Sequence, residues 1–334
     1  MSKFWIDQID RATREEDSWV KKGRQVVKRY ADRRGDQSDG KTKFNILWAN
    51  TETTRPALIS SVPNPEIRPR YKKKDPVARV AAKILERAIT FSLDQYDFIK
   101  CGKRIVQDYL LPGRGVARVK YKPVFEKKEE KVPLTLQERD GETVFVDSGG
   151  KVFDDAEVGD EGFFGTSETE EVVFEDVFVE RVAWQWFRME PADEWKNVNW
   201  VAFGAPYTKD EGMREWGKKF MGATEEAKKD GNQEKALEGK VIVWEVWDKR
   251  TRKQYFVAKG LDKPLETNSD PLKLVDFFPI PEPIYIVEDN DTMIPTPEFC
   301  LWQDQADELD LLSELDLGPS VMLNCEGNLN PIAF

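Results

Sequence analysis

The side chains of this chain that could do chemistry are acids and bases, because histidine is absent from all 334 residues. That absence removes the commonest general base, the usual metal ligand and every Ser-His or Cys-His nucleophilic arrangement. The run Asp193-Glu194-Trp195-Lys196 contains the Glu-x-Lys element of many metal-dependent nucleases, whose acids hold Mg²⁺ while the lysine stabilises charge near the phosphate. No acid at strand spacing precedes this run. We therefore expect a surface turn, with a metal-dependent nucleic-acid-processing enzyme as the alternative.

Three further motifs imitate ligand sites without meeting their requirements. Gly113-Arg114-Gly115 lies between a predicted helix and a predicted strand, whereas a dinucleotide fingerprint needs strand, turn, helix and a third glycine. Gly149-Gly150-Lys151 lacks the upstream glycine and the following Ser or Thr of a phosphate-binding loop. The acidic run at 154–162, DDAEVGDEG, lacks the residue order of an EF-hand loop. We therefore predict no catalytic residue, no cofactor and no metal.

Three basic residues follow the glycine turn, namely Arg114, Arg118 and Lys120, and their spacing places them on one side of a strand. They are candidates for phosphate-backbone contacts, but no exposed aromatic residues are interleaved with them. The pattern favours an exposed strand face or salt bridges at a subunit interface.

Charge is unevenly distributed along the chain. Residues 1–120 hold 27 Lys and Arg against 15 Asp and Glu, which gives a net charge of +12. Because the whole chain has a net charge of −11, the remaining residues carry −23. Such polarity can steer unlike faces together during assembly, or place one sign of charge along nucleic acid.

Five of the eleven tryptophans fall between Trp184 and Trp216. In a strand, Val182, Trp184 and Trp186 would face one way, while Ala183 and Phe187 would face the other. Both faces would then be apolar, which predicts a strand covered on both sides, in the core or at a subunit interface. A tryptophan platform that stacks sugars would leave one face polar, so a carbohydrate-binding module is the other alternative.

The order of the predicted elements is that of an α+β protein. Apolar periodicity predicts helices at 4–33, 44–60, from Asp75-Pro76 onward and at 95–110, and a strand follows the glycine turn. Residues 140–180 hold 14 acids and one base. They resemble a surface loop that precedes a strand, VVFEDVFVERVAWQWFRM at 172–189. A capping box at Thr208 and Glu211, a β-hairpin in 240–260 and a last helix from about Pro297 follow.

The cysteine content and the absence of long apolar segments indicate the cellular compartment. The three cysteines are far apart and odd in number, which suggests neither a disulfide framework nor a zinc site and fits a reducing compartment. No segment resembles a signal peptide or a membrane span, so we expect a cytosolic chain without a membrane partner.

Several segments occur together in an order that resembles the portal proteins of short-tailed, double-stranded DNA bacteriophages. They are NILWANTETTRPALISSVPNPEIRPRY, DPVARVAAKILERAI, DYLLPGRGVARVKY, the tryptophan-rich run, VWEVWDKRTRKQYFVAKG and IPTPEFCLWQDQADELDLLSE, and together they cover about residues 1–314. None of the segments is catalytic, but their joint order is specific. The positions that carry the resemblance are Trp48, Asn50, Pro56, Gly113, Gly115, Trp186, Trp200, Trp247, Gln303 and Asp304.

The resemblance implies one subunit of a twelve-membered ring at a capsid vertex of the virion, assembled in the host cytoplasm. DNA would pass through the ring, and terminase, capsid and tail adaptor proteins would be its partners. The implied parts are a helical wing part with a first strand at 1–125, an acidic loop or insertion at 126–170 and a β-rich wing part at 171–260. A proline-rich connector at 261–296 and a helix toward the stem at 297–314 follow.

The sequence departs from the portal pattern after Glu314, where LDLGPSVMLNCEGNLNPIAF replaces the expected continuation of the helix. Gly318-Pro319 would stop a helix within about a turn. We expect residues 315–334 to be a divergent tail of a truncated or frameshifted portal, which leaves ring formation by this chain to be tested.

Overall fold

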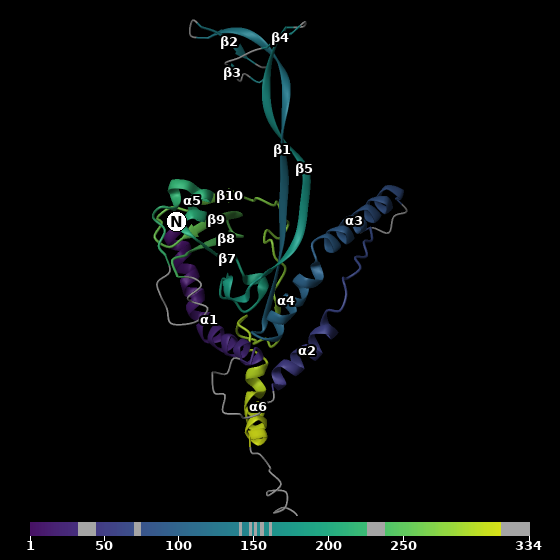
Figure 1. The fold of residues 1–334 in the computed structure, drawn as a ribbon, viewed down its shortest axis with the longest axis vertical. Helices are drawn as coiled ribbons and strands as arrows, with labels where there is room; N and C mark the ends of the chain where they lie inside the picture. Colours follow the sequence, from purple (N-terminus) through teal and green to yellow (C-terminus); the bar gives the residue numbers. More distant parts are fainter. Residues whose placement is uncertain are drawn as a thin grey trace, which may run out of the picture. The chain divides into compact units, whose positions relative to one another are not determined.

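The computed structural model describes residues 1–32, 45–69, 75–139, 142–146, 149, 152–153, 157–159, 162–225 and 238–314. Within these ranges helices and antiparallel strands occupy separate stretches, which confirms the α+β class (Figure 1). Two units are distinguished: one combines Met1–Val119 with Val179–Phe334, and the other is Lys120–Phe178. The helices are α1 Ser2–Tyr30, α2 Ile46–Leu58, α3 Pro76–Gln95, α4 Phe98–Leu110, α5 Lys209–Trp216 and α6 Phe299–Glu314.

The first unit is built on a five-stranded antiparallel sheet in the order β10-β9-β8-β7-β6. Its longest pairing joins β7 and β8 over eight positions, from Trp200 opposite Asp248 to Tyr207 opposite Val241. β8 and β9 form the predicted hairpin, and Arg252 takes a positive φ of 51° in its turn. The strand bounds are β6 Phe187–Met189, β7 Trp200–Tyr207, β8 Val241–Asp248, β9 Lys253–Ala258 and β10 Glu266–Ser269.

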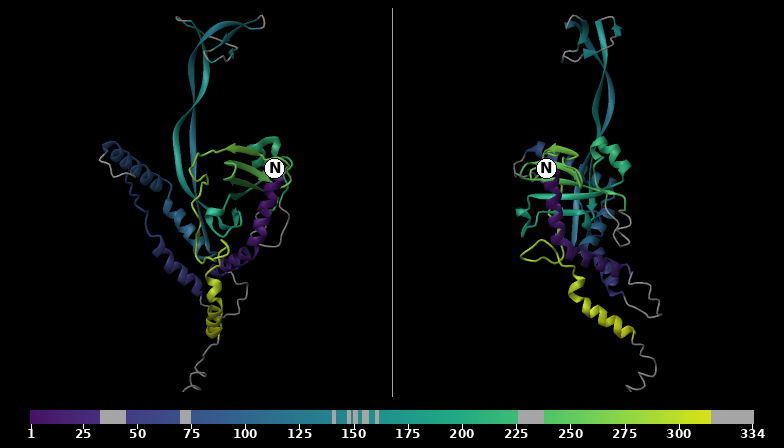
Figure 2. Two further views of the ribbon diagram at one scale, coloured as in Figure 1. Left: turned by 180° about the vertical axis from the view of Figure 1, so that it is seen from behind. Right: turned by 90° about the vertical axis from the view of Figure 1, so that its left-hand side faces the viewer.

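Both faces of this sheet are buried. Alternate residues of β8 point to opposite faces, and each set packs in a separate core. Trp244 and Val246 pack with Trp5, Ile6 and Ile9 of α1, which runs along one face (Figure 2). Trp247 packs on the other face, in a core supplied by β6, β7 and the segment between β10 and α6. That core contains Val116, Val182, Phe187, Met189, Val198, Val201, Phe203, Trp247, Phe277, Phe278, Ile280 and Met293.

Local signals at helix starts are confirmed. The Asp75 carboxylate accepts a hydrogen bond from the Val77 amide at 2.9 Å, and Pro76 is the first residue of α3. Thr208 and Glu211 form the predicted capping box of α5, which is followed by a 3-10 turn at Gly217–Phe220. Pro56 lies inside α2 near its C-terminal end.

The tryptophan-rich run corrects one prediction. Strand β5, Gly162–Val182, ends before the first tryptophan, and Trp184–Trp186 form a 3-10 turn, so the predicted alternation across 182–187 is wrong. The apolar side chains are nevertheless enclosed on more than one side: Trp184 packs on Trp19, and Phe187 lies in the core on the other face of the sheet. A run that is apolar in every direction does not distinguish a strand from a tight turn.

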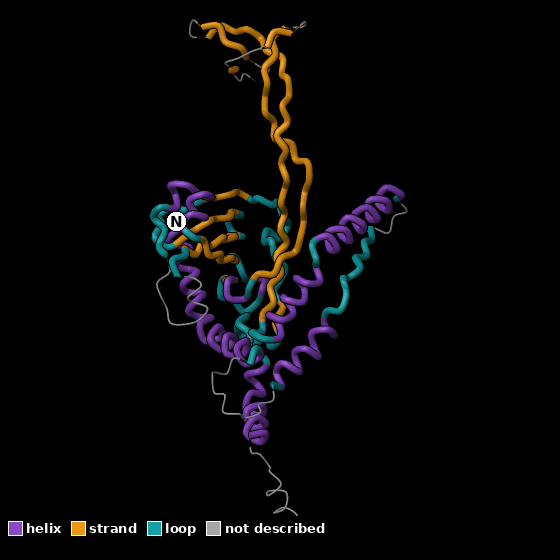
Figure 3. Tube along the Cα trace, in the orientation of Figure 1, coloured by secondary structure: helices purple, strands orange, loops and turns teal. Residues whose placement is uncertain are grey.

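The second unit, Lys120–Phe178, is made of strands, although the sequence suggested an acidic loop or insertion at 126–170. Most of β1, Arg114–Arg139, and of β5 belong to it and lie side by side as a two-stranded ribbon (Figure 3). Phe145 and Phe163 have ring centroids 5.1 Å apart, and Leu134 and Val146 are buried. Its short strands are β2 Glu142–Val146, β3 Val152–Phe153 and β4 Glu157–Gly159.

The proline-rich connector lies within the first unit. Its β11, Ile284–Tyr285, pairs antiparallel with the first residues of β1, and Arg114 lies opposite Tyr285. α6 begins close to the predicted position, and Trp302 takes a non-helical conformation inside it.

Candidate functional site

The glycine turn after α4 places Arg114 inside the first unit. Gly113 has a φ of +97°, a conformation that favours glycine, and its amide donates to the carbonyl of Asp108 at 3.1 Å. A Cβ on Gly115 would lie 2.7 Å from the backbone oxygen of Ile105. Both glycines are therefore required by the turn itself, which explains the Gly-x-Gly pattern without a nucleotide.

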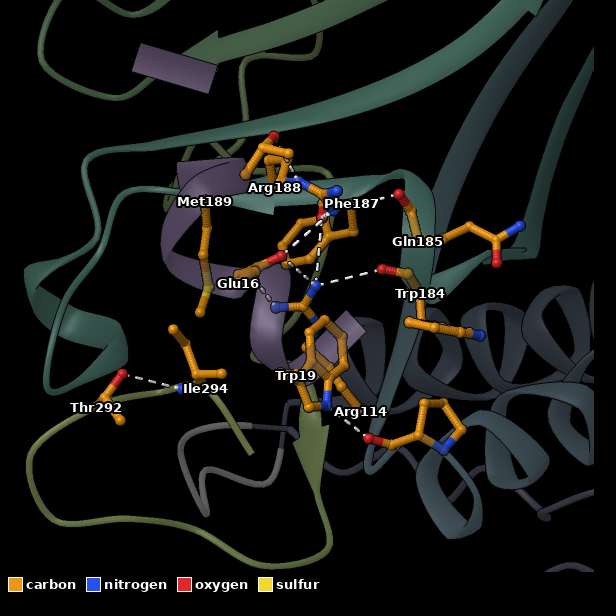
Figure 4. Close-up of polar contacts among 12 residues, drawn as sticks. Glu16, Trp19, Arg114, Trp184, Gln185, Phe187, Arg188, Met189, Thr292 and Ile294 are labelled. Carbon is orange, nitrogen blue, oxygen red and sulfur yellow. Dashed lines mark hydrogen bonds and ion pairs between the residues drawn. The ribbon is translucent and has the colours of Figure 1, made fainter. Parts of the chain in front are cut away.

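The Arg114 side chain is fully buried and is held by Glu16 of α1 (Figure 4). Its Nη1 donates to Glu16 Oε1 at 2.6 Å, and its Nη2 donates to Oε2 at 3.2 Å. Nη2 also lies within hydrogen-bond distance of the carbonyls of Trp184, at 3.3 Å, and Phe187, at 3.2 Å. The guanidinium carbon is 4.2 Å from the Trp19 ring centroid. One arginine thus ties α1 to the 3-10 turn and to β6.

Arg188 is a second buried base beside the same carboxylate. Its Nη1 lies 3.3 Å from Glu16 Oε2 and donates to the Phe187 carbonyl at 2.7 Å, while its Nε donates to Thr13 Oγ1 at 3.0 Å. Burial lowers the pKa of Arg188; Arg114 and Arg24 act in the same direction, and Glu16 opposes them. The three side chains, Glu16, Arg114 and Arg188, form what we call the Glu16 cluster.

Arg118 makes a second ion pair of the same kind. Its two terminal nitrogens lie 2.9 and 2.5 Å from the carboxylate of Glu245 on β8. Glu245 also accepts hydrogen bonds from Trp247 and Gln254. Burial alone would raise the pKa of Glu245, but the charge of Arg118 and the three donors outweigh it and hold the pKa below its ordinary value.

These contacts correct the predicted exposed face of basic residues. Arg114 is 0% exposed and Arg118 has a side chain that is 12% exposed, and both are engaged by carboxylates of their own chain. Neither is available to a phosphate. Lys120 is half-buried and lies in the second unit. Arg114 and Arg118 therefore do not form the exposed basic face that the sequence predicted.

The Glu-x-Lys run forms a surface turn. Asp193 accepts hydrogen bonds from the Glu194 amide at 2.9 Å and from Asn197 Nδ2 at 2.7 Å, and Lys196 pairs with Glu194. The hydrogen bond from Asn197 is the main reason that the pKa of Asp193 is lowered. Within the described residues, no group of three or more acids or cysteines is arranged to hold a metal ion.

Two other motifs cannot be placed in this way. Gly150, Lys151 and most of the acidic run at 154–162 lie outside the described residues, as does the tail 315–334.

The clustered tryptophans pack against aromatic rings of the same chain. Trp184 has its ring centroid 5.3 Å from that of Trp19, and the separation of Trp200 from Trp5 is 6.1 Å. The other three are at least partly covered: Trp186 lies near Trp244, Trp195 near Phe278, and Trp216 near Phe220. A sugar-stacking platform needs an open ring face, and these rings are used within the fold.

The positions that carry the family resemblance fall into a buried group and an exposed group. Gly113, Gly115, Trp200 and Trp247 are buried and Trp186 is half-buried, so these five support the interior of the first unit. The exposed ones lie on α2 and α6, namely Trp48, Asn50, Pro56, Gln303 and Asp304.

Sequence reasoning missed the acids that partner the arginines. Glu16 interrupts the apolar face of α1 between Ala12 and Trp19, and an acid inside an apolar stripe is a signal that a buried base faces it. Glu245 gives the same signal on β8, because its neighbours on the same face, Val243 and Trp247, are both apolar and buried. A third pair, between Asp108 of α4 and Arg181, has hydrogen bonds of 2.5 and 2.7 Å.

A comparison with models of known protein families finds no match, and a search of curated proteins finds none either. Among the helices of the described ranges, none is long and apolar enough to cross a membrane.

Proposed function

We propose that this chain is a subunit of a phage portal, or the N-terminal part of one, and that its role is mechanical: it contributes to a ring that conducts DNA. The ordered resemblance across about residues 1–314 supports this proposal. The subunit would act as a homo-oligomer of about twelve copies at the portal vertex of the virion, with double-stranded DNA, terminase, capsid and tail adaptor proteins as partners. The proposal gives no residue a catalytic role and requires no cofactor.

The observation that carries the proposal is the use of the segment DYLLPGRGVARVKY as a structural joint. Its two glycines form a tight turn, Arg114 reaches Glu16 of α1, and Arg118 reaches Glu245 of β8. Asp108 in the same segment binds Arg181 at the end of β5. One short segment thus connects one helix and two strands through ion pairs, as a wing domain under mechanical force would need.

Surface composition also favours assembly. Large apolar side chains remain exposed on α2 and α3, including Trp48, Leu58, Ile84 and Phe91. Contiguous exposed apolar surface on a folded chain marks a site of association. Acid-rich and base-rich stretches in one chain favour contacts between unlike surfaces.

The mass of the purified full-length chain in solution, measured by mass photometry and checked by negative-stain microscopy, tests the proposal. We expect closed rings of several copies. A monomer at every concentration tested would overturn the proposal for this chain. Incubation with DNA and Mg²⁺ tests the enzyme alternative: we expect no cleavage, and cleavage that disappears in Glu194→Ala would contradict a purely mechanical role.

A further inference from the structure

Helix α3 carries an apolar row that the described fold leaves uncovered. Val77, Val80, Ile84, Ala88 and Phe91 recur at three- and four-residue spacing, so they share one face of the helix. Ile84 is 63% exposed and Phe91 is 58% exposed. The opposite face is the one that packs: Ala82 is buried, and Glu86 accepts a hydrogen bond from the Ile67 amide at 3.3 Å. The apolar row is therefore free to meet another surface.

A row of bases borders this apolar row. Arg79, Lys83 and Arg87 are spaced four residues apart and form an oblique ridge that approaches the apolar row from Arg79 to Arg87, and all three are exposed. None of the three makes an ion pair with another described residue. The face that α3 presents is thus apolar with a positive edge.

The ribbon of the second unit presents the complementary combination. Along β5, Glu171, Val173, Glu175 and Val177 alternate onto one face, and Val173 is 59% exposed. Both acids have exposed partners within the ribbon: Glu171 lies 3.5 Å from Lys128, and Glu175 accepts a hydrogen bond from Tyr121 at 2.7 Å. The other face carries the exposed Val172 and Phe174. Over this stretch β1 and β5 have no third strand paired to them within the described residues. A two-stranded ribbon with apolar side chains on both faces is marginally stable in water alone, so it needs a covering surface.

We propose that α3 of one copy of this chain packs on the β5 face of the ribbon of a second copy, with Arg79 and Arg87 opposite Glu171 and Glu175. This inference rests on the proposed function, because it names the surfaces through which subunits of a ring join. The contact pairs two different surfaces, so each copy offers one of each and the contact repeats head to tail. Repetition of this kind closes into a ring or continues as a filament.

The spacing of the charges supports this register. Arg79 and Arg87 are eight helical residues apart, which corresponds to a rise of about 12 Å. Glu171 and Glu175 are four strand residues apart, which corresponds to about 13 Å. In this register Val173 lies beside Ile84 and Val177 lies beside Phe91, since the rise is about 3.3 Å per strand residue and about 1.5 Å per helix residue. Packing of α3 on a second α3 would instead oppose two rows of bases, which is unfavourable.

Charge reversal with complementation is the test, read by mass photometry of the full-length chain at low and high salt. The first variant carries Arg79→Glu and Arg87→Glu, and the second carries Glu171→Arg and Glu175→Arg. A third combines all four changes. The matched control reverses two exposed lysines elsewhere, Lys253→Glu and Lys263→Glu, and so makes the same change of charge as the first variant. Circular dichroism and thermal unfolding check that each variant folds.

The first and second variants are expected to associate at least roughly tenfold more weakly than wild type, because each places like charges together. The combined variant and the control should assemble as wild type does. An equimolar mixture of the first and second variants should also assemble, because each variant attracts the other and repels itself. Raising the salt should weaken wild-type assembly.

The alternatives predict different results. If α3 docks on the ribbon of its own chain, the combined variant recovers assembly but the mixture does not, which would overturn the proposal.

A basic amphipathic helix can also bind membranes, so binding to vesicles of phosphatidylserine and phosphatidylcholine is measured as well. Vesicle binding that the first variant abolishes while assembly stays unchanged would overturn the proposal. Assembly unaffected by both reversals would refute this interface and leave the portal proposal standing, whereas a monomeric wild type would refute both.

Discussion

The carboxylate of Glu16 receives two hydrogen bonds from the guanidinium of Arg114, at 2.6 and 3.2 Å, although 98 residues separate them in the chain. Arg188 lies 3.3 Å from the same carboxylate. The attraction within a buried ion pair roughly offsets the cost of desolvation, but the loss of one partner leaves an uncompensated charge. We infer that the Glu16 cluster mainly fixes how α1 meets β6 and the 3-10 turn.

Glu16→Gln is expected to lower the free energy of unfolding by about 3–5 kcal/mol, because Arg114 and Arg188 would remain buried without their acid. Urea denaturation followed by tryptophan fluorescence measures this change. The control is Glu15→Gln one position earlier, whose partly exposed carboxylate pairs with Arg11 at 3.1 Å and should contribute less than about 1 kcal/mol. Equal losses in the two variants would contradict a special role for the cluster.

Gly115→Ala tests the tight approach of β1 to α4. A Cβ at this position would lie 2.7 Å from the Ile105 carbonyl oxygen and 2.9 Å from the Ile284 side chain. Backbone must shift to admit it, and we expect a loss of about 1–3 kcal/mol in the free energy of unfolding, seen as a lower Tm. Gly222→Ala is the comparison, because its Cβ would lie 3.2 Å from the end of the Leu261 side chain and at an ordinary contact distance, 3.8 Å, from the Gly260 carbonyl oxygen. An unchanged Tm in Gly115→Ala would show that the turn can relax.

Glu245 makes stability depend on acid pH. Despite burial, which acts to raise it, the pKa of Glu245 is held low by Arg118 and by the Trp247 and Gln254 donors. A carboxylate with a lowered folded-state pKa contributes its stability above the unfolded-state value, about 4.3, and loses it as the pH falls through the folded-state value.

The corresponding variant is Glu245→Gln, and the measurement is urea denaturation at a series of pH values from 7 downward. Wild type should lose stability on acidification more steeply than the variant does. Glu194→Gln, an exposed acid of the surface turn, is the control and should leave the slope unchanged. Parallel curves for wild type and Glu245→Gln would show that other carboxylates dominate the acid response.

Local signals in the sequence predicted local structure well. The N-cap at Asp75 and the capping box at Thr208 depend on residues within one turn of each other, so the pattern alone is sufficient. The hairpin of β8 and β9 was predicted for the same reason. Partners distant in sequence were not predicted, because no spacing rule connects Glu16 with Arg114, or Arg118 with Glu245.

Two further differences have physical causes. The tryptophan-rich run is apolar on all sides, so its periodicity could not separate a strand from the 3-10 turn at Trp184–Trp186. In the second unit the density of acids suggested a loop ahead of a strand from Val172, whereas β5 already begins at Gly162, where phenylalanine and threonine lie among the acids. The start of α3 at Asp75-Pro76 was predicted, while the exposure of its apolar face depends on the packing of the opposite face and could not be predicted.

Trp48 is the tryptophan that the fold leaves most open among those whose surroundings are described: it is 52% exposed on α2, whereas Trp200 and Trp247 are buried. An exposed indole is quenched readily by acrylamide and emits at longer wavelength than a buried one. Trp48→Phe should therefore remove a readily quenched, red-shifted component and leave a blue-shifted emission. If α2 is covered when copies associate, the component from Trp48 should also shrink as concentration rises.

The comparison variant is Trp302→Phe on α6. It replaces a half-buried ring whose centroid lies 4.7 Å from that of Phe299, so it should change the acrylamide quenching less. Addition of oligosaccharides should leave both spectra unchanged, because the clustered tryptophans pack on their own chain; a sugar-dependent shift that survives Trp48→Phe would contradict this assignment and favour a carbohydrate-binding role.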